Sequence, residues 1–182
     1  MSKVRSLPQA YFKRTMKQAI VIFPERNKEI ELIRKKYDPF YKKFRMHITL
    51  VFPFKYIDQN QLNEHIKKSI LGIKSFKLVL NGVKKSPKEY YLYFIVKTGN
   101  KSILAIHKRL YSHLLTKWLR KDIPYIPHIT LGVFKTKAQI NKALEKLKNK
   151  NLKLETVVDR IYLLNLKKDL SLKSFKRFKF KI

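Results

Sequence analysis

The sequence predicts an α+β fold that is bilobal and duplicated. We expect two small, mostly antiparallel sheets backed by helices and related by a pseudo-two-fold axis, with a central cleft. Strand-like apolar runs alternate with segments whose apolar residues recur at helical spacing, in the same order in both halves. The motif His-Ile-Thr-Leu also occurs twice, at residues 47–50 and 128–131. Because an internal repeat sets the architecture of a chain, these observations together predict a duplication.

The composition is typical of a folded and very basic protein. The 182 residues include 43 Lys and Arg against 12 Asp and Glu, a net charge of +31, and 45% are hydrophobic, enough to fill a core. We expect a basic N-terminal tail over residues 1–17 and a single domain over 18–182, its lobes interleaved around the two motifs. The absence of cysteine excludes disulfide scaffolds, zinc ribbons and thiol nucleophiles. No apolar run could span a bilayer and no secretory signal is visible, so we expect a soluble, cytoplasmic monomer with no membrane partner.

The first half is predicted to run strand, helix, strand, helix, strand. Apolar and β-branched runs indicate the strands, and Asn27 and Asp58 can cap the helices that follow them. Asp38-Pro39 ends the first helix, because the residue before a proline is pushed out of the α region. The expected elements are a strand over 18–23, a helix to Tyr37, a strand over 45–54, a helix with Leu62, Ile66 and Ile70 on one face, a strand over 76–80 and a turn at Asn81-Gly82.

The second half repeats this order and adds further strands. Apolar residues at helical spacing predict one long helix from Ser102 to Leu119, and Thr136 can cap another that reaches Lys148. Strands are expected over 90–96, 129–134, 152–158, 161–166 and 178–182.

The positive charge indicates a polyanionic partner. Nucleic acid fits best, since each phosphate that Lys or Arg neutralises releases counterions. Coding bias towards AT-rich codons is the alternative, because only nine of the 43 basic residues are Arg. That bias explains Lys over Arg but not the scarcity of acidic residues, so RNA or an oligonucleotide remains the expected partner.

The two His-x-Thr strands are the candidate site. The pattern His-x-Thr should arise by chance only about 0.2 times in a chain with this many His and Thr. Because side chains alternate along a strand, His47 and Thr49 share one face, and His128 and Thr130 share the equivalent face of the second strand. Their apolar neighbours face the helices, so the two histidines and two threonines are predicted to converge at the cleft.

Two imidazoles beside one phosphate suit general acid–base catalysis. Histidine titrates near neutrality, so one ring can accept a proton while the other, charged, donates one. The hydroxyls of Thr49 and Thr130 can hydrogen-bond the non-bridging phosphate oxygens. No metal or other cofactor is expected, since the chain has no carboxylate cluster, His-Glu-x-x-His motif or Gly-rich phosphate loop. His65 is expected to be a half-exposed helix residue. His107 and His113 are expected to be structural, because six residues apart on one helix is the wrong spacing for a shared metal face.

Paired His-x-Thr-x motifs in a duplicated chain of this length resemble the 2H phosphoesterase superfamily, and within it the bacterial 2′-5′ RNA ligase-like (RNA 2′,3′-cyclic phosphodiesterase) branch. The similarity includes the segments 33–39, 47–54 (HITLVFPF) and 125–132. The resemblance implies a bilobal fold with metal-independent chemistry on RNA-type phosphodiesters. It also implies His47 and His128 as the acid–base pair and Thr49 and Thr130 as phosphate ligands. Met46 stands where this branch often has a proline, and Lys135 stands where some relatives have an arginine nearby.

Contacts beyond the motifs are less defined. Tyr125 and Phe134 could stack on a base, or simply pack in the core or cleft wall. Lys135 could contact a phosphate, or be a solvated residue at the end of a strand.

The predicted function is hydrolysis of RNA ends that carry a 2′,3′-cyclic phosphate, with 2′-5′ ligation as the reverse reaction. The resemblance favours a 2′-phosphate product. One alternative keeps the site but acts on 2′-5′-linked oligonucleotides or small cyclic nucleotides. Another is an RNA-binding module with little catalysis, and a third makes both histidines satisfied polar residues of the fold.

Overall fold

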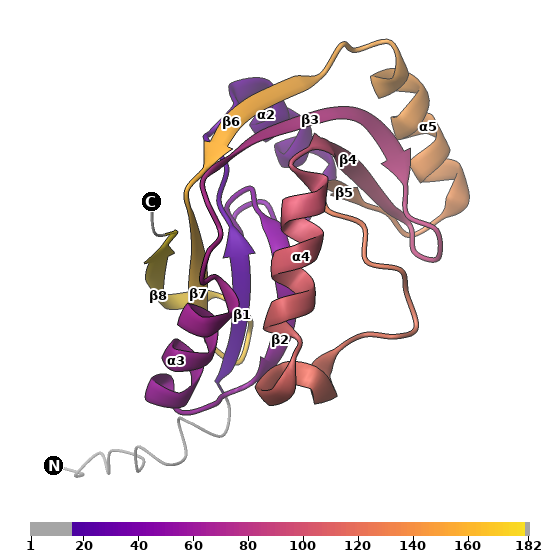
Figure 1. The fold of residues 1–182 in the computed structure, drawn as a ribbon. Coiled ribbons are helices and arrows are strands. Elements are labelled where there is room, and N and C mark those ends of the chain that lie inside the picture. The colour runs from indigo at the N-terminus through magenta and orange to yellow at the C-terminus, as the bar shows by residue number, and fades with distance from the viewer. Residues whose placement is uncertain (1–15, 181–182) are drawn as a thin grey trace, which may run out of the picture.

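The computed structural model describes residues 16–180. The basic tail predicted for residues 1–17 lies outside this part except for Met16 and Lys17, and the first strand already begins at Lys17. The elements, in chain order, are β1 (Lys17–Ile22), α2 (Lys28–Tyr37), β2 (Ile48–Lys55), α3 (Gln59–Ser69), β3 (Phe76–Lys85), β4 (Tyr91–Thr98), α4 (Asn100–Leu110), the 3₁₀ helix η1 (His113–Trp118), β5 (His128–Val133), α5 (Lys137–Lys148), β6 (Lys153–Val158), β7 (Arg160–Leu166) and β8 (Leu172–Lys179) (Figure 1).

The strands form one curled, antiparallel sheet in the order β6-β3-β4-β5-β2-β1-β7-β8. The α+β class and the antiparallel pairing predicted from the sequence are therefore confirmed. The two expected small sheets are the halves β6-β3-β4-β5 and β2-β1-β7-β8, and they are joined where Ile48 pairs with Ile129. The halves do not follow the two sequence halves predicted: β3, expected in the first sheet, pairs with β4 and β6 of the second, whereas β7 and β8 join β1 and β2.

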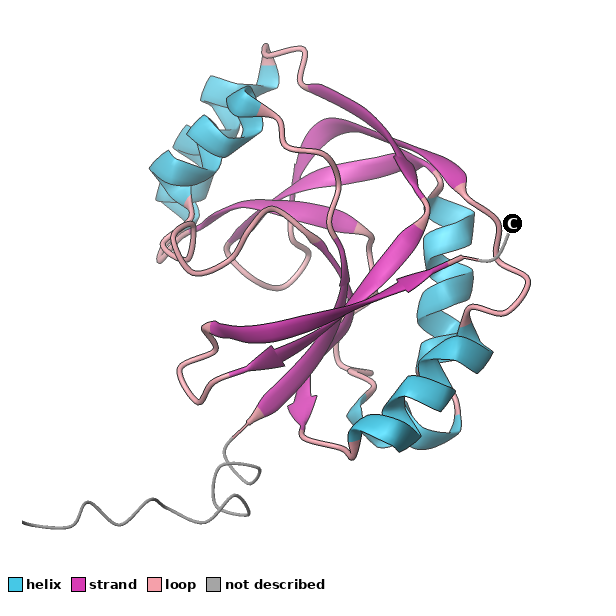
Figure 2. Ribbon diagram, turned by 90° about the vertical axis from the view of Figure 1, so that its left-hand side faces the viewer, coloured by secondary structure: helices cyan, strands magenta, loops and turns pink. Residues whose placement is uncertain are grey.

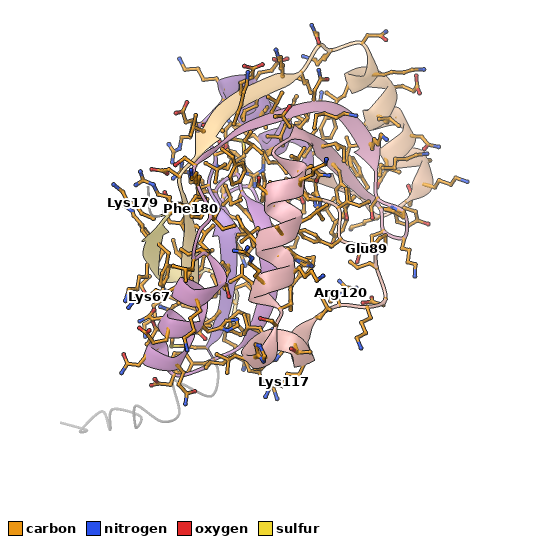
Figure 3. All side chains as sticks on the ribbon, in the orientation of Figure 1. Lys67, Glu89, Lys117, Arg120, Lys179 and Phe180 are labelled. Atoms are coloured by element: carbon orange, nitrogen blue, oxygen red, sulfur yellow. The ribbon has the colours of Figure 1, made fainter. Side chains whose placement is uncertain are left out.

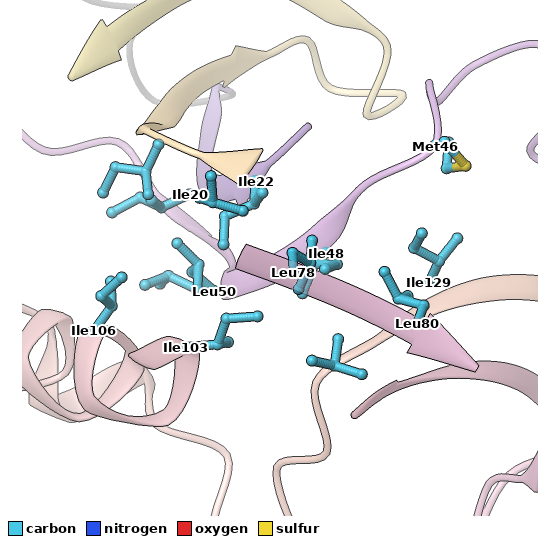
Figure 4. Close-up of a cluster of buried hydrophobic side chains, with 14 of the residues drawn as sticks. Ile20, Ile22, Met46, Ile48, Leu50, Leu78, Leu80, Ile103, Ile106 and Ile129 are labelled. Carbon is cyan, nitrogen blue, oxygen red and sulfur yellow. The ribbon is translucent and has the colours of Figure 1, made fainter. Parts of the chain in front are cut away.

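Helices cover one face of each half. α3 packs beside α4, which lies against β2, whereas α2 packs on β5 and α5 on β3 (Figures 1 and 2). The apolar side chains of β1, β2 and β3 meet those of α4 and β5 in one core (Figure 4). Charged side chains such as Lys67 of α3 and Lys117 of η1 project outward (Figure 3). In residues 16–180, no helix combines the length and the apolar character that crossing a membrane requires.

The turn predicted at Asn81-Gly82 is wrong, because β3 continues through it. Asn81 pairs with Lys153 of β6, and Val83 pairs with Phe94 of β4, so partners on both sides hold the strand extended. Gly82 has a φ of +82°, and the register against β4 shifts between Leu80 and Val83. The Asn-Gly pair thus forms an irregularity within a long strand, in the manner of a β-bulge.

The single helix predicted from Ser102 to Leu119 is broken. α4 ends at Leu110, and η1 starts at His113, whose φ of +47° lies in the left-handed region. The change of direction buries Leu115 completely and brings Trp118 onto Phe54, with ring centroids 5.5 Å apart. Helical periodicity in the sequence continued because the apolar residues of η1 also face the core.

Two strand boundaries also differ from the prediction. β2 begins at Ile48, so Arg45 precedes it. β8 begins at Leu172, well before the strand predicted over 178–182, of which residues 181 and 182 lie outside the described part. The helices capped by Asn27, Asp58 and Thr136 start as predicted, with each cap side chain accepting a backbone N–H.

Candidate active site

The two His-Ile-Thr-Leu motifs meet at the centre of the sheet. Ile48 of β2 pairs with Ile129 of the antiparallel strand β5. In that register, His47 lies opposite Thr130, and Thr49 lies opposite His128. Each histidine therefore faces the threonine of the other motif.

Burial follows the alternation predicted from the sequence. Ile48, Leu50, Ile129 and Leu131 are completely buried in the core beneath the helices. The two histidines and two threonines are only partly buried, on the opposite face. Among residues 16–180, neither threonine hydroxyl is hydrogen-bonded to another protein group, so both are available to a ligand.

Each of the two catalytic candidates makes a hydrogen bond from its ring to the backbone carbonyl group two residues before it. His47 Nδ1 lies 2.7 Å from the carbonyl oxygen of Arg45, and His128 Nδ1 lies 2.6 Å from that of Ile126. Because a carbonyl oxygen only accepts, Nδ1 carries the hydrogen in each ring. The neutral imidazoles therefore present Nε2 as a proton acceptor, and no described group hydrogen-bonds to either Nε2.

Aromatic rings enclose the two imidazoles. Tyr93 of β4 stacks on His128, with centroids 3.5 Å apart and planes 18° from parallel. Phe44 and Phe23 approach His47 at 6.1 and 6.4 Å between centroids. These contacts restrict the rotamers of both rings and keep the histidines oriented.

Burial lowers the pKa of both histidines. The pKa of His47 falls below its usual value mainly because the ring is desolvated, and the nearby Arg34 guanidinium adds to the shift, while the carbonyl of Arg45 and the Asp38 carboxylate oppose it. Burial lowers the pKa of His128 to about 4, with a further contribution from the charge of His47. At neutral pH both rings are therefore uncharged in the free protein.

A pocket of about 120 Å³ opens beside His47. Its walls combine one buried ion pair, aromatic rings and residues of the second motif, namely Arg34, Asp38, Phe40, Phe44, His47, Tyr91, Ile129, Thr130 and Val133. The pocket thus lies between α2, the segment that leads from α2 to His47, and β5. Of the four motif residues, His47 and Thr130 line it, whereas Thr49 and His128 are not among its described lining residues.

The ion pair fixes the segment that leads to His47. Arg34 Nη2 donates to Asp38 Oδ2 at 2.7 Å and to the carbonyl oxygen of Phe44 at 2.9 Å, and Asp38 Oδ1 accepts the Phe40 N–H. Arg34 is 2% exposed and Asp38 is 7% exposed. Arg34 Nε and Nη1 have no hydrogen-bond partner among the described residues, although Glu31 lies 3.6 Å from Nη1. This pair was not predicted, and the signal for it was an arginine at an apolar position of α2 followed four residues later by Asp38.

Three further residues considered from the sequence make contacts within the protein. Tyr125 donates its hydroxyl to the carbonyl oxygen of Thr49 at 2.8 Å and stacks on His107, with centroids 3.5 Å apart. Phe134 packs on Tyr37 at 5.8 Å. The backbone N–H of Lys135 donates to Gln139. None of the three is among the described residues that line the pocket, and ligand contacts by them stay predictions.

The other histidines contact backbone carbonyl groups. His107 Nδ1 bonds the carbonyl oxygen of Leu50, and His65 Nε2 bonds that of Leu110. Within residues 16–180, no three His, Asp or Glu side chains gather into a group that could hold a metal ion.

Solved structures share this fold. The structure of Escherichia coli LigT in complex with 3′-AMP aligns with a TM-score of 0.55 at 14% identity, covering 91% of this chain and 95% of LigT. A crystal structure described as a phosphoesterase aligns with a TM-score of 0.54 at 12% identity, covering 92% of this chain and 99% of the other. At such identities the likeness establishes the fold alone.

Sequence comparison identifies the family to which the chain belongs. Residues 22–170 match the model of the 2′-5′ RNA ligase superfamily, and the chain belongs to that superfamily. A Bacillus cereus protein assigned as a phosphoesterase is 31% identical over 156 residues, covering 82% of this chain and 88% of the relative. A Geobacillus protein with the same assignment is 29% identical over 155 residues, covering 82% and 87%. The resemblance predicted from the two motifs is thereby confirmed at the level of the family.

Proposed function

We propose that this phosphoesterase-family protein hydrolyses 2′,3′-cyclic phosphate ends of RNA without a metal ion. One observation carries the proposal: His47 and His128 face the threonines of each other's motif, and both are anchored through Nδ1 with Nε2 free. General acid–base catalysis needs two such groups, one on the attacking side of the phosphorus and one on the leaving side.

In the proposed reaction, the Nε2 of one histidine accepts a proton from water as the water oxygen bonds to phosphorus. The Nε2–H of the other histidine, in its protonated form, donates to the ribose oxygen as the P–O bond breaks. The cyclic phosphate is thereby converted to a phosphomonoester beside a free ribose hydroxyl. The histidine that accepted a proton is now charged, and the one that donated a proton is now neutral. We expect the 3′ oxygen to leave, which gives a 2′-phosphate.

The substrate also supplies the charge that the second histidine needs. Burial lowers the pKa of both rings in the free protein, and a phosphate anion between them raises both again. Thr49 and Thr130 would donate to the non-bridging oxygens and hold the phosphorus in line with the two Nε2 atoms.

The relatives support a nucleotide substrate. LigT has been solved with 3′-AMP bound, and the superfamily is named for 2′-5′ RNA ligation. Ligation would be the reverse of the proposed reaction, with an RNA hydroxyl in the place of water. We propose that the RNA ends concerned are cytoplasmic.

The proposal is tested by incubating the protein, in EDTA, with an oligoribonucleotide that ends in a 2′,3′-cyclic phosphate. We expect conversion to a product whose terminal phosphate a phosphatase removes, at a rate that EDTA does not change. Hydrolysis of only 2′-5′-linked oligonucleotides or small cyclic nucleotides would replace this substrate by another. Absence of turnover, with salt-sensitive RNA binding, would show a binding module instead.

A further inference from the structure

A row of aromatic rings runs from His47 to the edge of the sheet. Phe23, after β1, lies 6.4 Å from His47, Tyr162 of β7 lies 4.8 Å from Phe23, and Phe175 of β8 lies 5.9 Å from Tyr162, all between ring centroids. Each pair meets edge to face, at 61° to 78°. We call Phe23, Tyr162 and Phe175 the aromatic row.

Strand register places this row on the face that carries the active site. Val21 of β1 pairs with both Thr49 and Tyr162, and Tyr162 pairs with Arg177. Directly paired residues project to the same side of a sheet, as do residues two apart on one strand. Thr49, Tyr162 and Arg177 therefore share one face, and Phe175, two residues before Arg177, joins them. On this face Phe23 and Tyr162 also pack beside a small buried apolar cluster that includes Val21.

Two arginines accompany the row. The guanidinium carbon of Arg45 lies 4.9 Å from the Phe23 centroid, and that of Arg177 lies 5.4 Å from the Phe175 centroid. Both arginines are exposed, and among residues 16–180 neither lies within 4.0 Å of a carboxylate oxygen. Their charges are therefore available to an anionic ligand.

The row is also accessible at its outer end. Phe175 is 45% exposed although it is a large aromatic residue on a folded sheet, and Phe23 and Tyr162 are partly exposed. β8 is the last strand of the sheet, so described chain borders it on one side only. Arg45 also donates Nη2 to the carbonyl oxygen of Pro24 at 3.3 Å, which leaves its charge without an ion-pair partner among the described residues. Aromatic rings with such arginines beside them match the two components of single-stranded nucleic acids, bases that stack and phosphates that carry charge.

We propose that the aromatic row and its two arginines bind the RNA nucleotides that precede the cyclic phosphate. The terminal phosphate would lie between the histidines, and the strand would run in the 5′ direction across β1, β7 and β8 to Phe175. This inference rests on the proposed function, because the position of the cyclic phosphate between the histidines fixes the direction in which the RNA strand runs. It adds a binding surface for several nucleotides, and it makes RNA chains of three or four nucleotides better ligands than mononucleotides.

The test measures binding rather than turnover. The ligand is a 5′-fluorescein tetraribonucleotide with a 3′-phosphate, which has no cyclic ester to open, and fluorescence anisotropy reports its Kd. We expect Phe175→Ala to weaken binding by at least about fivefold, and Phe175→Trp to retain it, because tryptophan also offers a face for stacking. We expect Arg177→Gln to reduce the slope of log Kd against log salt by about 0.7, the share of one phosphate contact.

Two control substitutions make the same kinds of change at exposed residues outside the aromatic row. Tyr90→Ala removes a ring that is 48% exposed, in the segment just before β4, and Tyr90 is not among the described residues that line the pocket. Lys146→Gln removes one exposed positive charge on α5. Neither control should alter the Kd by more than about twofold. Equal effects of Phe175→Ala and Tyr90→Ala, or an unchanged salt slope for Arg177→Gln, would overturn the proposal.

Hydrolysis of cyclic-phosphate ends on one and on four nucleotides separates this inference from the proposed function. The ratio of kcat/KM for the tetranucleotide to that for the mononucleotide should fall in Phe175→Ala. Turnover of both lengths with the same kcat/KM in the parent would overturn the RNA surface and leave the proposed reaction standing. RNA binding that depends on Phe175, in a protein that turns over neither length, would overturn the proposed reaction and leave the RNA surface standing.

Discussion

Ile48 of β2 pairs with Ile129 of β5, and at this pair the two halves of the sheet are joined. Each isoleucine is the middle residue of a His-Ile-Thr sequence, so the pairing that completes the sheet also completes the site. On the core side, both isoleucines are fully buried. On the other side, each histidine lies opposite the threonine of the other motif. Core packing between the halves thus determines how far apart the four polar side chains lie.

Removing the carboxylate of Asp38 should destabilise the protein strongly. Asp38→Ala leaves the Arg34 guanidinium buried without its ion-pair partner, which costs about 3–5 kcal/mol, and also releases the Phe40 N–H. Urea unfolding should show this loss. The matched control is Asp122→Ala, which breaks the exposed Arg120–Asp122 pair and should change stability little. Equal effects of the two substitutions would show that the buried pair does not hold the segment before His47.

Removing the hydroxyl of Tyr125 should lower the stability of the protein. Tyr125→Phe deletes the hydrogen bond to the carbonyl oxygen of Thr49 but keeps the ring that stacks on His107. We expect a loss of about 1 kcal/mol in the free energy of unfolding, because a partly buried carbonyl loses its donor. Tyr90→Phe, at an exposed site, is the matched control. Unchanged stability in Tyr125→Phe would mean that this bond is replaced by water.

Adding a methyl group at Gly132 should disturb the packing of α2 on β5. A Cβ at Gly132 would lie 2.7 Å from the Cβ of Tyr37 and 3.0 Å from the Phe134 ring, so backbone or side chains must move. Gly132→Ala should therefore cost about 1–3 kcal/mol in stability. Thermal unfolding of this variant at the same Tm as the parent would contradict the close approach of helix and strand.

The stability of the protein should fall in mild acid. Burial depresses the pKa of His47, and that of His128 to about 4, below the unfolded value of 6.5. The unfolded chain therefore binds more protons than the folded one as the pH falls from 6.5 towards 4, and stability decreases across this window. His128→Asn removes one of these groups, so its loss of stability between pH 7.5 and 5 should be smaller than the parent's. Urea titrations at the two pH values decide this, and equal losses in both proteins would contradict it.

The pH dependence of catalysis should separate the free protein from the complex. With both pKa values lowered, the base is ready at neutral pH but the acid is largely deprotonated, so kcat/KM should peak on the acid side of pH 6.5. The phosphate charge raises both values in the complex, so kcat should peak at a higher pH than kcat/KM. A kcat/KM that stays constant from pH 7 to 9 would contradict the assignment of two histidines as acid and base.

Local pattern predicted much of the site, and non-local contacts supplied the rest. Alternation along a strand was enough to place His47 and Thr49 on one face, because the period of two is a property of any strand. The pairing of Ile48 with Ile129 joins segments about eighty residues apart, and local periodicity carries no information on such a partner. The stacking of Tyr93 on His128 depends on another non-local pairing, that of β4 with β5.

The same division explains the errors in the fold. Asn81-Gly82 has the local signature of a turn, and only the partners that β3 finds in β4 and β6 keep the strand extended. The break after Leu110 lies within continuous helical periodicity, and burial of Leu115 decides the new direction. Local propensity gave way to tertiary packing at both places.

The most direct test of the two-histidine site compares His47→Ala, His128→Ala and the double variant on an RNA end with a 2′,3′-cyclic phosphate, in EDTA. Each single variant should lose at least about 10²-fold in kcat, and the double variant should lose little more than the worse single one, because the two groups act as one unit. His65→Gln, which alters a histidine bound to the Leu110 carbonyl group, should keep the parental rate. Parental turnover in either His47→Ala or His128→Ala would contradict the two-histidine mechanism.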